Sequence, residues 1–412
     1  MKIFMINSVC GTGSTGRICT DLAERLEADG HDCMIAYGRR AVPEKYRKYA
    51  VKIGSKSDVY VHGAQARLFD SVGFGSKHAT KMLIKKIEAY DPDVIHLHNL
   101  HGYYVNIEVL FSYLKEANKP IVWTLHDCWA FTGHCVHYDA IGCRKWKDSC
   151  HHCSLKKSYP SSLLMDRSAT NYQKKKALFN MPDNITLVTP SDWLADQVRQ
   201  SFLGDRPVQT IYNGIDCGVF CSTPGDIKNR YGLQNKKIAL GVANIWDERK
   251  GLIYMIRLSK LLDPGWTVVL IGLTPKQKKT LPPNIVGIQR TDDLRELAEW
   301  YSAADVYVNV SSEETMGMTT AEAISCGTPV AAFDATAVSE IVGHNGITVP
   351  YGNVNELAKA VDMISKKGKS FFENDNSRFA LENEYRAYLK LYEQLADQGN
   401  TEKLTAVNYV KQ

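Results

Sequence analysis

The chain has 412 residues, a formal net charge of +5, 44% hydrophobic and 23% charged residues. This length exceeds one hydrophobic core and predicts two domains, and the average composition excludes disordered, collagen-like and coiled-coil proteins. The small positive charge does not by itself favour a nucleic-acid-binding protein, and no apolar run reaches the roughly 18 residues of a membrane-spanning helix.

The chain begins with a strand, a glycine-rich loop and a helix. Residues 3–7 predict a buried strand that turns polar too early for a signal peptide, so we expect a cytoplasmic protein. A helix follows through Ile18, Leu22 and Leu26 and ends at Gly30. Further short apolar runs predict strands at 33–37, 93–97, 121–125 and 185–189.

A second series of strands and helices follows a turn-rich stretch at 204–207. Its expected strands cover 237–242, 267–271, 305–310 and 329–333, and its expected helices cover 251–262, 294–303 and 319–326. Such alternation predicts parallel sheets with helices on both faces. We therefore predict an α/β fold of two Rossmann-like domains facing across a cleft. Their expected ranges are 1–205, with a cysteine-rich insertion at about 128–180, and 206–376.

The loop after the first strand reads Gly11-x-Gly13-x-x-Gly16. Glycines let the backbone approach a ligand closely, and a helix N-terminus favours an anion, so the loop predicts a site for a phosphate-bearing or sugar ligand. A tight turn that packs strand against helix is the alternative. A nicotinamide cofactor is disfavoured, because the second strand runs into Gly38-Arg39 without the acidic residue that the ribose needs.

Two acidic residues, Glu314 and Glu322, follow the strand expected at 305–310, with Gly317 between them. The amides near Met318 and Thr319, at the start of the next helix, suit a diphosphate. The carboxylates can accept hydrogen bonds from sugar hydroxyls. For Glu322, a capping box with Thr319 is an equally weighted alternative.

Arg249 and Lys250 lie after the strand at 237–242 and before a helix. Two adjacent cations in that place can hold phosphates, the arginine through its fork geometry and the lysine as a point charge. Solvated surface charge is the alternative.

Histidines end two strands of the N-terminal half, where a parallel sheet presents its ligands. A neutral imidazole can hydrogen-bond a sugar hydroxyl or carry a proton, although structural histidines are more common. A zinc site is a weaker alternative. These histidines are His96, His98, His101 and His126. The zinc site would use His96, His98 and His126.

Eleven cysteines in a cytosolic chain are expected to be reduced. Four of them fall close together in the insertion, at Cys135, Cys143, Cys150 and Cys153. Four thiolates bind zinc tetrahedrally, and a structural zinc pins a loop that lacks its own core. The spacing favours such a zinc over free thiols and makes a redox role remote.

The insertion is also basic and aromatic, with Lys156-Lys157 and Lys174-Lys175-Lys176 interleaved with Tyr159 and Tyr172. This composition suggests contact with an anionic membrane or a lipid-diphosphate acceptor. A solvated loop fits it equally well.

Together these residues resemble the retaining glycosyltransferases of family 4, which have the GT-B architecture. The specific mark is Glu314-x7-Glu322 followed by the segment AISCGTPV at 323–330. The resemblance covers nearly the whole chain and is supported by 211–216, 301–306, 249–251, the glycine-rich loop and 124–127. It departs at Asn244-Ile245-Trp246, where the family usually carries an arginine before the lysine, so we expect Arg249 to substitute.

The resemblance implies a role for each matched residue. Arg249 and Lys250 would neutralise the diphosphate of the leaving nucleotide, Glu322 would hold the ribose, and His126 would face the transferred sugar. Glu314 would bind the hexose and phosphates with nearby amides. The donor-binding set then comprises Gly13, Asn244, Met316, Gly317, Met318, Thr319 and Glu322.

The resemblance implies a metal-independent transferase that moves a hexose, with retention, from a nucleotide-diphosphate sugar to a glycan or lipid-linked hydroxyl in bacterial surface polysaccharide synthesis. The N-terminal domain would face the acceptor, the C-terminal domain would bind the nucleotide sugar, and a helix within 377–412 would pack back on the N-terminal domain. Any membrane contact would be on the inner face. A nucleotide-sugar epimerase of the same architecture is the enzymatic alternative. A zinc-module nucleic-acid-binding protein is disfavoured by the acidic pair and the mild charge, so nucleic acid is not an expected partner.

Overall fold

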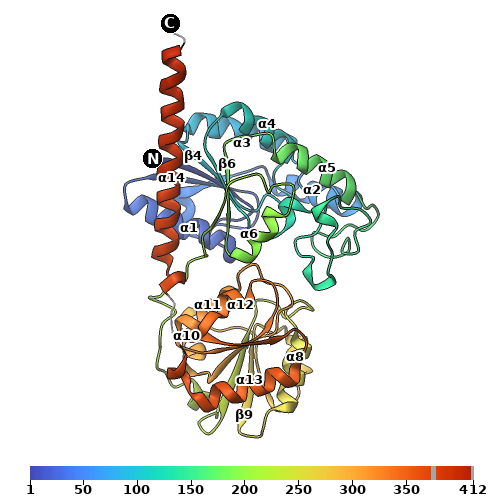
Figure 1. Ribbon diagram of the computed structural model, residues 1–412, viewed down its shortest axis with the longest axis vertical. Coiled ribbons are helices and arrows are strands. Elements are labelled where there is room, and N and C mark those ends of the chain that lie inside the picture. The colour runs from blue at the N-terminus through green and yellow to red at the C-terminus, as the bar shows by residue number, and fades with distance from the viewer. Residues whose placement is uncertain (373–376, 410–412) are drawn as a thin grey trace. The chain divides into compact units, whose positions relative to one another are not determined.

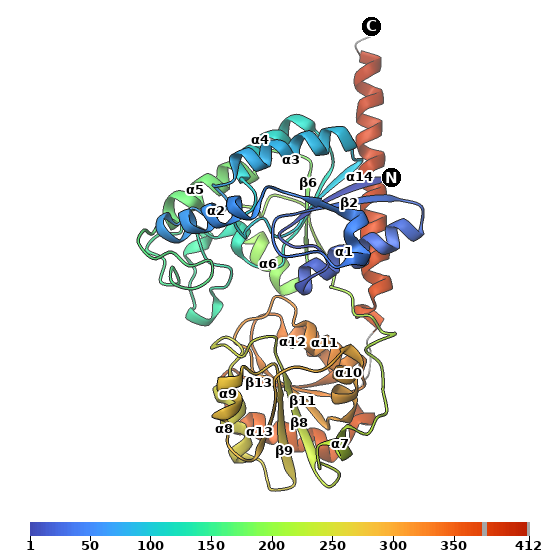
Figure 2. The same ribbon diagram turned by 180° about the vertical axis from the view of Figure 1, so that it is seen from behind.

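The computed structural model describes residues 1–372 and 377–409. The parts of the sequence-based domain ranges that fall on 373–376 and 410–412 lie outside the described residues. The chain forms two compact units, one comprising Met1–Ile211 with the chain from Tyr385 onward, the other comprising Tyr212–Glu384 (Figures 1 and 2). The boundary follows the turn at 204–207 because the edge strand β7 (Val208–Thr210) still pairs with β6 (Ile185–Thr189).

The first unit is built on a sheet of seven strands in the order β3-β2-β1-β4-β5-β6-β7. Every pairing is parallel. Besides β6 and β7, the strands are β1 (Lys2–Asn7), β2 (Asp32–Tyr37), β3 (Ala50–Lys52), β4 (Val94–Leu97) and β5 (Ile121–Thr124). The connecting helices are α1 (Gly13–Ala28), α2 (Lys56–Phe69), α3 (Lys77–Tyr90), α4 (Ile107–Ala117), α5 (Ser168–Phe179) and α6 (Asp192–Arg199).

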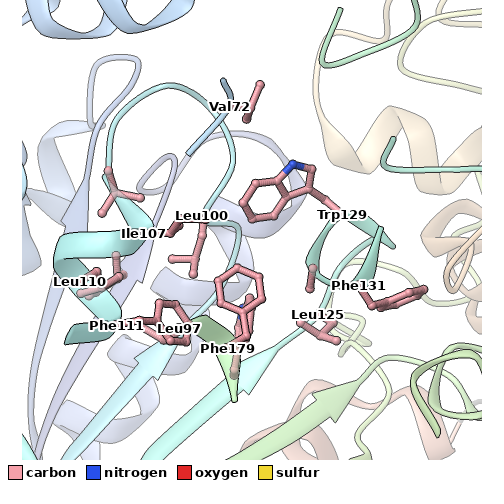
Figure 3. Close-up of a cluster of buried hydrophobic side chains, with 14 of the residues drawn as sticks. Val72, Leu97, Leu100, Ile107, Leu110, Phe111, Leu125, Trp129, Phe131 and Phe179 are labelled. Atoms are coloured by element: carbon pink, nitrogen blue, oxygen red, sulfur yellow. The ribbon is translucent and has the colours of Figure 1, made fainter. Parts of the chain in front are cut away.

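Both faces of this sheet are buried, because successive side chains of a strand point to opposite faces. In β1, Phe4 and Ile6 contribute to the core under α3 and α4, whereas Ile3 and Met5 pack under α1. Figure 3 shows the first of these cores, where Leu97 meets side chains of α4 and α5. A strand buried on both faces reads as a continuous apolar run, which is why β1 is recognisable in the sequence.

The second unit repeats this plan with six parallel strands in the order β10-β9-β8-β11-β12-β13. The strands are β8 (Lys237–Val242), β9 (Trp266–Ile271), β10 (Ile285–Ile288), β11 (Val306–Asn309), β12 (Val330–Asp334) and β13 (Gly346–Pro350). One face is covered by α10 (Leu294–Ala303), α11 (Met318–Ser325) and α12 (Val338–Val342). The other face is covered by α8 (Leu252–Leu261) and α13 (Val354–Lys367), and the short helices α7 (Ile227–Arg230) and α9 (Pro275–Lys279) complete the unit.

The last helix, α14 (Leu381–Tyr409), runs along the first unit (Figure 1). Its Tyr388 and Tyr392 are fully buried in the core under α1. The Tyr392 hydroxyl lies 2.6 Å from Nδ1 of His96 on β4, and the Tyr388 hydroxyl lies 2.8 Å from Oγ1 of Thr124 on β5. Tyrosines one turn apart therefore join the end of the chain to the ends of two central strands.

The cysteine-rich segment differs from the rest of the first unit. Between β5 and α5 it contains only the 3-10 turns η2 (Trp129–Phe131), η3 (Asp139–Ile141) and η4 (Lys145–Lys147). Its Phe131, Tyr138 and Trp146 pack on one another, with ring centroids 5.0 Å apart for the last two and 5.3 Å apart for Phe131 and Trp146. A segment of this length without helix or strand is uncommon inside a compact domain.

In the part of the chain that the structure describes, none of the helices combines the length and the hydropathy needed to cross a membrane.

Candidate functional site

The strand order reverses at one place in each sheet, between β1 and β4 in the first and between β8 and β11 in the second. Ligands of open α/β sheets bind outside the carboxyl ends of strands at such switch points. The glycine-rich loop and His98 flank the first switch point, and the loops carrying Lys250 and Glu314 flank the second. The sheet topology thus collects most of the residues singled out from the sequence at these two places.

In the second unit, Glu314 is held in a fixed position by the loop after β11. Its backbone N–H donates to Oγ1 of Thr336 over 2.8 Å, and that hydroxyl donates to the Glu314 carbonyl over 2.8 Å. Two residues earlier, Ser312 donates its N–H to the carbonyl of Arg249 over 2.9 Å. These bonds tie the two loops at the switch point together.

The carboxylate of Glu314 pairs with both cations of the neighbouring loop. Nζ of Lys250 donates to Oε1, and Nη1 of Arg249 lies 3.8 Å from Oε2. Arg249 also donates to the carbonyl of Glu313 over 2.8 Å. The structure therefore brings Arg249, Lys250 and Glu314 together, whereas solvated surface charge was the alternative for the two cations.

Burial works to raise the pKa of Glu314, but the charges of Lys250 and Arg249 outweigh it and hold that pKa below its usual value. Glu314 is consequently ionised at neutral pH. Its side chain retains 11% of its exposure, while Lys250 and Arg249 retain 16% and 29%. The cluster is a partly desolvated group of charges that an anionic ligand can still reach.

Helix α11 begins directly after this loop, and its N-cap residue is Gly317, whose φ of 90° favours glycine. The first amides of a helix have no intrahelical partner, so those of Met318 and Thr319 are available to an anion. The alternative of a capping box between Thr319 and Glu322 is wrong, because Gly317 is the N-cap residue and no side chain caps the helix. The Thr319 hydroxyl instead accepts from Tyr307 over 2.8 Å, and Oε2 of Glu322 accepts from Tyr301 over 2.8 Å.

The side chains of two expected donor-binding residues, Asn244 and Met316, lie outside the cluster formed by Glu314, Lys250 and Arg249. Asn244 is exposed in the loop after β8. Met316 is 2% exposed and its side chain packs in the core beside α11, so only its backbone remains available. Trp246, which occupies the segment where the resembled family carries an arginine, is buried and donates its indole N–H to Ile271 over 2.9 Å.

In the first unit, the glycine-rich loop closes through a bond of 3.0 Å from the N–H of Gly11 to the carbonyl of Gly16. Gly13 starts α1 with a φ of 69°. Two polar atoms in this region, Oδ1 of Asn7 and Oγ1 of Thr12, are buried without a hydrogen-bond partner within the described chain. Unpaired buried polar atoms are costly, so they point to a ligand at this loop.

The histidines at the ends of β4 and β5 form a packed group. His98 and His126 are stacked, with Nδ1 of the first 3.0 Å from Nε2 of the second. Nε2 of His101 lies 2.6 Å from Oδ2 of Asp127, and its Nδ1 lies 3.2 Å from the hydroxyl of Tyr159. Nε2 of His98 is buried without a partner in the described structure, a further unsatisfied atom at the first switch point.

The alternative of a zinc site in this group was wrong. Nδ1 of His96 lies against the hydroxyl of Tyr392 and its Nε2 lies 2.8 Å from Oγ1 of Thr124, so neither nitrogen is left for a metal. In the described residues as a whole, no group of three or more His, Cys, Asp or Glu side chains is arranged to hold a metal ion. The predicted structural zinc therefore does not fit the lining formed by Cys135, Cys143, Cys150 and Cys153.

Burial lowers the pKa of His126 to about 4 and also lowers those of His96 and His98. A histidine with a depressed folded pKa contributes stability above its unfolded pKa of about 6.5, and this stability is lost as the pH falls toward the folded value. We expect the melting temperature to fall as the pH is lowered from about 6.5 to 4. His126 alone should lower the free energy of unfolding by up to about 3 kcal/mol over this range. Thermal denaturation measured across this pH range checks the prediction. His126→Gln should make the melting temperature depend less on pH, and an unchanged pH dependence would contradict the prediction.

The predicted basic and aromatic surface of the insertion needs a correction. Tyr172 is fully buried and Lys175 is 1% exposed, so neither contributes to a surface. Lys175 instead donates to the carbonyl of Trp129 over 2.5 Å. Both lie on α5, whose inward face packs against the protein.

Several residues of the site were not predicted as site residues from the sequence, although Tyr301 begins the matched segment 301–306. Tyr301 and Tyr307 lie on α10 and β11, and Thr336 follows β12, yet they orient Glu322, Thr319 and Glu314. Tyrosines and threonines at strand and helix ends are ordinary core or turn residues. Only the fold brings them to the site.

Two family profiles match adjacent parts of the chain and together cover most of it. "Glycosyltransferase Family 4" matches residues 15–219, and "Glycosyl transferases group 1" matches residues 236–367. A relative from Escherichia coli K12, named "Putative colanic acid biosynthesis glycosyl transferase WcaC", is 26% identical over 84% of this chain and 86% of its own. An "Uncharacterized 41.2 kDa protein in cps region" of Klebsiella pneumoniae is 21% identical over 92% and 96%.

Solved structures share the fold. A glycosyltransferase of Rickettsia africae superposes with a TM-score of 0.68 at 17% identity, covering 96% of this chain and 98% of its own. HepE of Anabaena, solved with UDP, superposes with a TM-score of 0.67 at 17% identity, covering 96% and 100%. The predicted fold class of two parallel Rossmann-like sheets is confirmed as GT-B-like. The chain therefore belongs to the group 1 glycosyltransferases of family 4.

Proposed function

We propose that this protein is a retaining hexosyltransferase, which moves a hexose from a nucleotide-diphosphate sugar to a hydroxyl of a glycan or lipid-linked acceptor. The observation that carries the proposal is the cluster of Glu314, Lys250 and Arg249 beside the first amides of α11. Cations and helix amides at one point suit a diphosphate, and a carboxylate beside them suits sugar hydroxyls.

Donor binding exchanges one anion for another. Without ligand, the Glu314 carboxylate pairs with Lys250 and Arg249. A diphosphate at the amides of Met318 and Thr319 takes over Lys250 and Arg249, which releases Glu314 to accept hydrogen bonds from the hexose. Glu322, oriented by the hydroxyl of Tyr301, accepts from the ribose.

The chemistry then rests on electrostatic stabilisation. The bond between the anomeric carbon and the phosphate oxygen breaks, and the negative charge that develops on the nucleoside diphosphate is neutralised by Lys250, Arg249 and the helix amides. The acceptor hydroxyl attacks on the same face, and its proton passes to the leaving phosphate oxygen, which preserves the anomeric configuration. This route uses no divalent ion.

The acceptor is proposed to be a growing bacterial surface polysaccharide. The printed names of the two long relatives, which mention colanic acid biosynthesis and a cps region, support a glycan acceptor. In the first unit, the loop at Gly13 flanks the switch point and His126 follows the next strand, β5. Three buried polar atoms of this region, on Asn7, Thr12 and His98, have no hydrogen-bond partner within the described residues. Because its pKa is about 4, His126 is neutral at physiological pH and can hydrogen-bond a sugar hydroxyl.

The test is a thermal-shift panel of UDP-, GDP- and ADP-sugars, followed by product analysis. A ligand that binds only the folded protein raises stability by RT ln(1 + [L]/Kd), so the true donor stands out. NMR of the product formed with acceptor should show the donor's anomeric configuration retained. Conversion of the donor to a different sugar in the absence of acceptor would instead identify an epimerase, and inversion would contradict the mechanism.

We also propose that the first unit docks on an anionic membrane surface through α2 and the loop before α5. On α2, Tyr60 and Val61 are 77% and 58% exposed, and on the loop, Leu163 and Leu164 are 63% and 67% exposed. The loop is joined to α2 by a bond of 2.7 Å from the N–H of Leu163 to the carbonyl of Arg67. The remaining members of this apolar patch are Leu68, Phe69 and Met165.

Exposed cations lie close to the apolar patch in the sequence, among them Lys56 and Arg67 on α2 and Lys157 and Arg167 before and after the loop. Apolar side chains with flanking cations are typical of surfaces that lie in the headgroup region of anionic bilayers. Each cation near such a surface contributes about 1 kcal/mol. A lipid-linked acceptor would be presented at that same surface.

Vesicle flotation tests the apolar patch. We expect the protein to float with vesicles that contain anionic lipid and to bind neutral vesicles several-fold less. Leu163→Glu combined with Leu164→Glu should abolish flotation, whereas Ile253→Glu, at a residue 52% exposed on α8 of the other unit, should not. Equal flotation of all variants, or none by the unchanged protein, would contradict the proposal.

A further inference from the structure

Two side chains of β11 hold the first turn of α11. Tyr307 and Asn309 are two residues apart, so their side chains lie on the same face of the strand. The hydroxyl of Tyr307 donates to Oγ1 of Thr319 over 2.8 Å, and Nδ2 of Asn309 donates to Oγ1 of Thr320 over 2.9 Å. Two adjacent threonines of the helix thus accept hydrogen bonds from the sheet.

The direction of the bond between Tyr307 and Thr319 follows from burial. Tyr307 is 1% exposed, and Oγ1 of Thr319 is the hydrogen-bond partner of its hydroxyl. A buried hydroxyl proton without an acceptor is costly, so Tyr307 donates. Burial raises the pKa of Tyr307, and the charges of Glu314 and Glu322 act in the same direction, so the hydroxyl stays protonated.

The hydroxyl proton of Thr319 is therefore directed away from Tyr307. Thr319 is partly exposed, and within the described chain its hydroxyl makes only the bond that it accepts. It is the second residue of α11, in the turn whose backbone amides have no intrahelical partner. The Thr319 hydroxyl and these amides are consequently donors at the same end of the helix.

A diphosphate at this end of α11 meets fewer cations than the resembled family provides. Where that family carries an arginine, this chain has Asn244-Ile245-Trp246, and Trp246 is buried with its indole N–H bonded to a backbone carbonyl. The cations beside the helix are Lys250 and Arg249, and both pair with Glu314. A further donor aimed at the diphosphate would stabilise its developing charge.

We propose that the Thr319 hydroxyl donates a hydrogen bond to the leaving diphosphate, and that Tyr307 is the positioning residue that directs it. This inference rests on the proposed function and adds a side-chain donor to the backbone amides of α11. The bond that Thr319 accepts strengthens the bond that it donates, because hydrogen bonds in a chain polarise one another. As charge develops on the leaving group the donated bond becomes stronger, so it raises kcat more than it tightens donor binding.

Thr319→Val tests the proposal, because valine has nearly the same shape and lacks the hydroxyl. We expect kcat to fall about 10- to 100-fold, the range for a hydrogen bond to a charged group, with a smaller change in the KM for the donor. Binding of inorganic pyrophosphate, measured by calorimetry, should weaken about 10-fold. Thr319→Ser should restore both values, and an unchanged kcat in Thr319→Val would overturn the proposal.

A double variant separates catalysis from stability. Thr319→Val leaves the buried hydroxyl of Tyr307 without its acceptor, so the melting temperature should fall. Adding Tyr307→Phe removes that hydroxyl and should restore the melting temperature, while kcat stays low.

The positioning role of Tyr307 has its own readout. Tyr307→Phe alone should lower kcat about 3- to 10-fold. In the Thr319→Val background it should cost no further activity, because Tyr307 acts through Thr319. Additive losses of activity in the double variant would contradict the positioning role.

Thr320→Val is the matched control. Thr320 also accepts a bond from β11 but is 1% exposed, so this variant should lose melting temperature and keep both kcat and pyrophosphate binding. Weakened pyrophosphate binding in Thr320→Val equal to that in Thr319→Val would refute the assignment to Thr319.

The same titrations distinguish failure of this inference from failure of the proposed function. If Lys250→Met weakens pyrophosphate binding and Thr319→Val does not, the proposed diphosphate site stands and the role of Thr319 is wrong. If neither pyrophosphate nor any of UDP, GDP and ADP binds the unchanged protein, the proposed function is itself wrong.

Discussion

Glu314→Gln is expected to lower kcat at least about 100-fold. The amide keeps the shape of the side chain but loses the charge that pairs with Lys250 and Arg249 and that would bind the sugar and its developing positive charge. The fold should survive, because both cations keep enough exposure to be solvated. Steady-state kinetics and a melting curve measure the two effects.

Glu299→Gln is the matched control for this variant. Glu299 lies on α10 of the same unit, is 17% exposed in its side chain and pairs with Arg230 over 2.6 Å. Glu299→Gln therefore removes the charged partner of an arginine at similar burial, but of Arg230 rather than of the site cations Arg249 and Lys250. Equal losses of activity in the two variants would assign the effect of Glu314→Gln to stability rather than to catalysis.

Lys250→Met should lower kcat by about 1,000-fold, the scale seen when a preorganised group that stabilises transition-state charge is removed. It should also weaken binding of the nucleoside diphosphate product, because the methyl end of methionine cannot neutralise phosphate. Arg249→Met should cost less, since Arg249 is the more exposed of the two and already donates to the carbonyl of Glu313. Single-turnover kinetics and product titration separate these effects.

Lys228→Met provides the control for the lysine. Lys228 pairs with Asp305 over 3.3 Å in the same unit and lies outside the candidate site. It should keep activity with a small loss of stability, as surface ion pairs contribute less than about 1 kcal/mol. Full activity of the Lys250→Met variant would show that Lys250 takes no part in catalysis.

The sequence predicted the larger part of the fold because buried parallel strands are continuous apolar runs. β1, β8 and β9 are buried on both faces and are recognisable at once. The sequence missed the four edge strands, β3, β7, β10 and β13. β3 and β7 are only three residues long, and β10 and β13 are four and five residues long with incomplete burial, so their patterns are too weak to detect.

The site could be predicted in part. Local motifs placed Glu314 and Lys250 at strand ends, and the parallel topology brought them together. Local spacing offered a capping box as an alternative role for Glu322, yet Tyr307 and Tyr301 hold Thr319 and Glu322 through contacts that spacing does not encode. Likewise, nothing in the sequence indicated that Lys175 would turn inward to the carbonyl of Trp129, because its neighbours in sequence are also lysines.

A crystal structure with the nucleoside diphosphate sugar that gives the largest thermal shift would test the central claim most directly. We predict that the pyrophosphate lies against the amides of Met318 and Thr319 in contact with Lys250, with Glu314 turned to the hexose and Glu322 to the ribose. A nucleotide bound elsewhere in this unit, with Glu314 still paired to Lys250, would contradict the account.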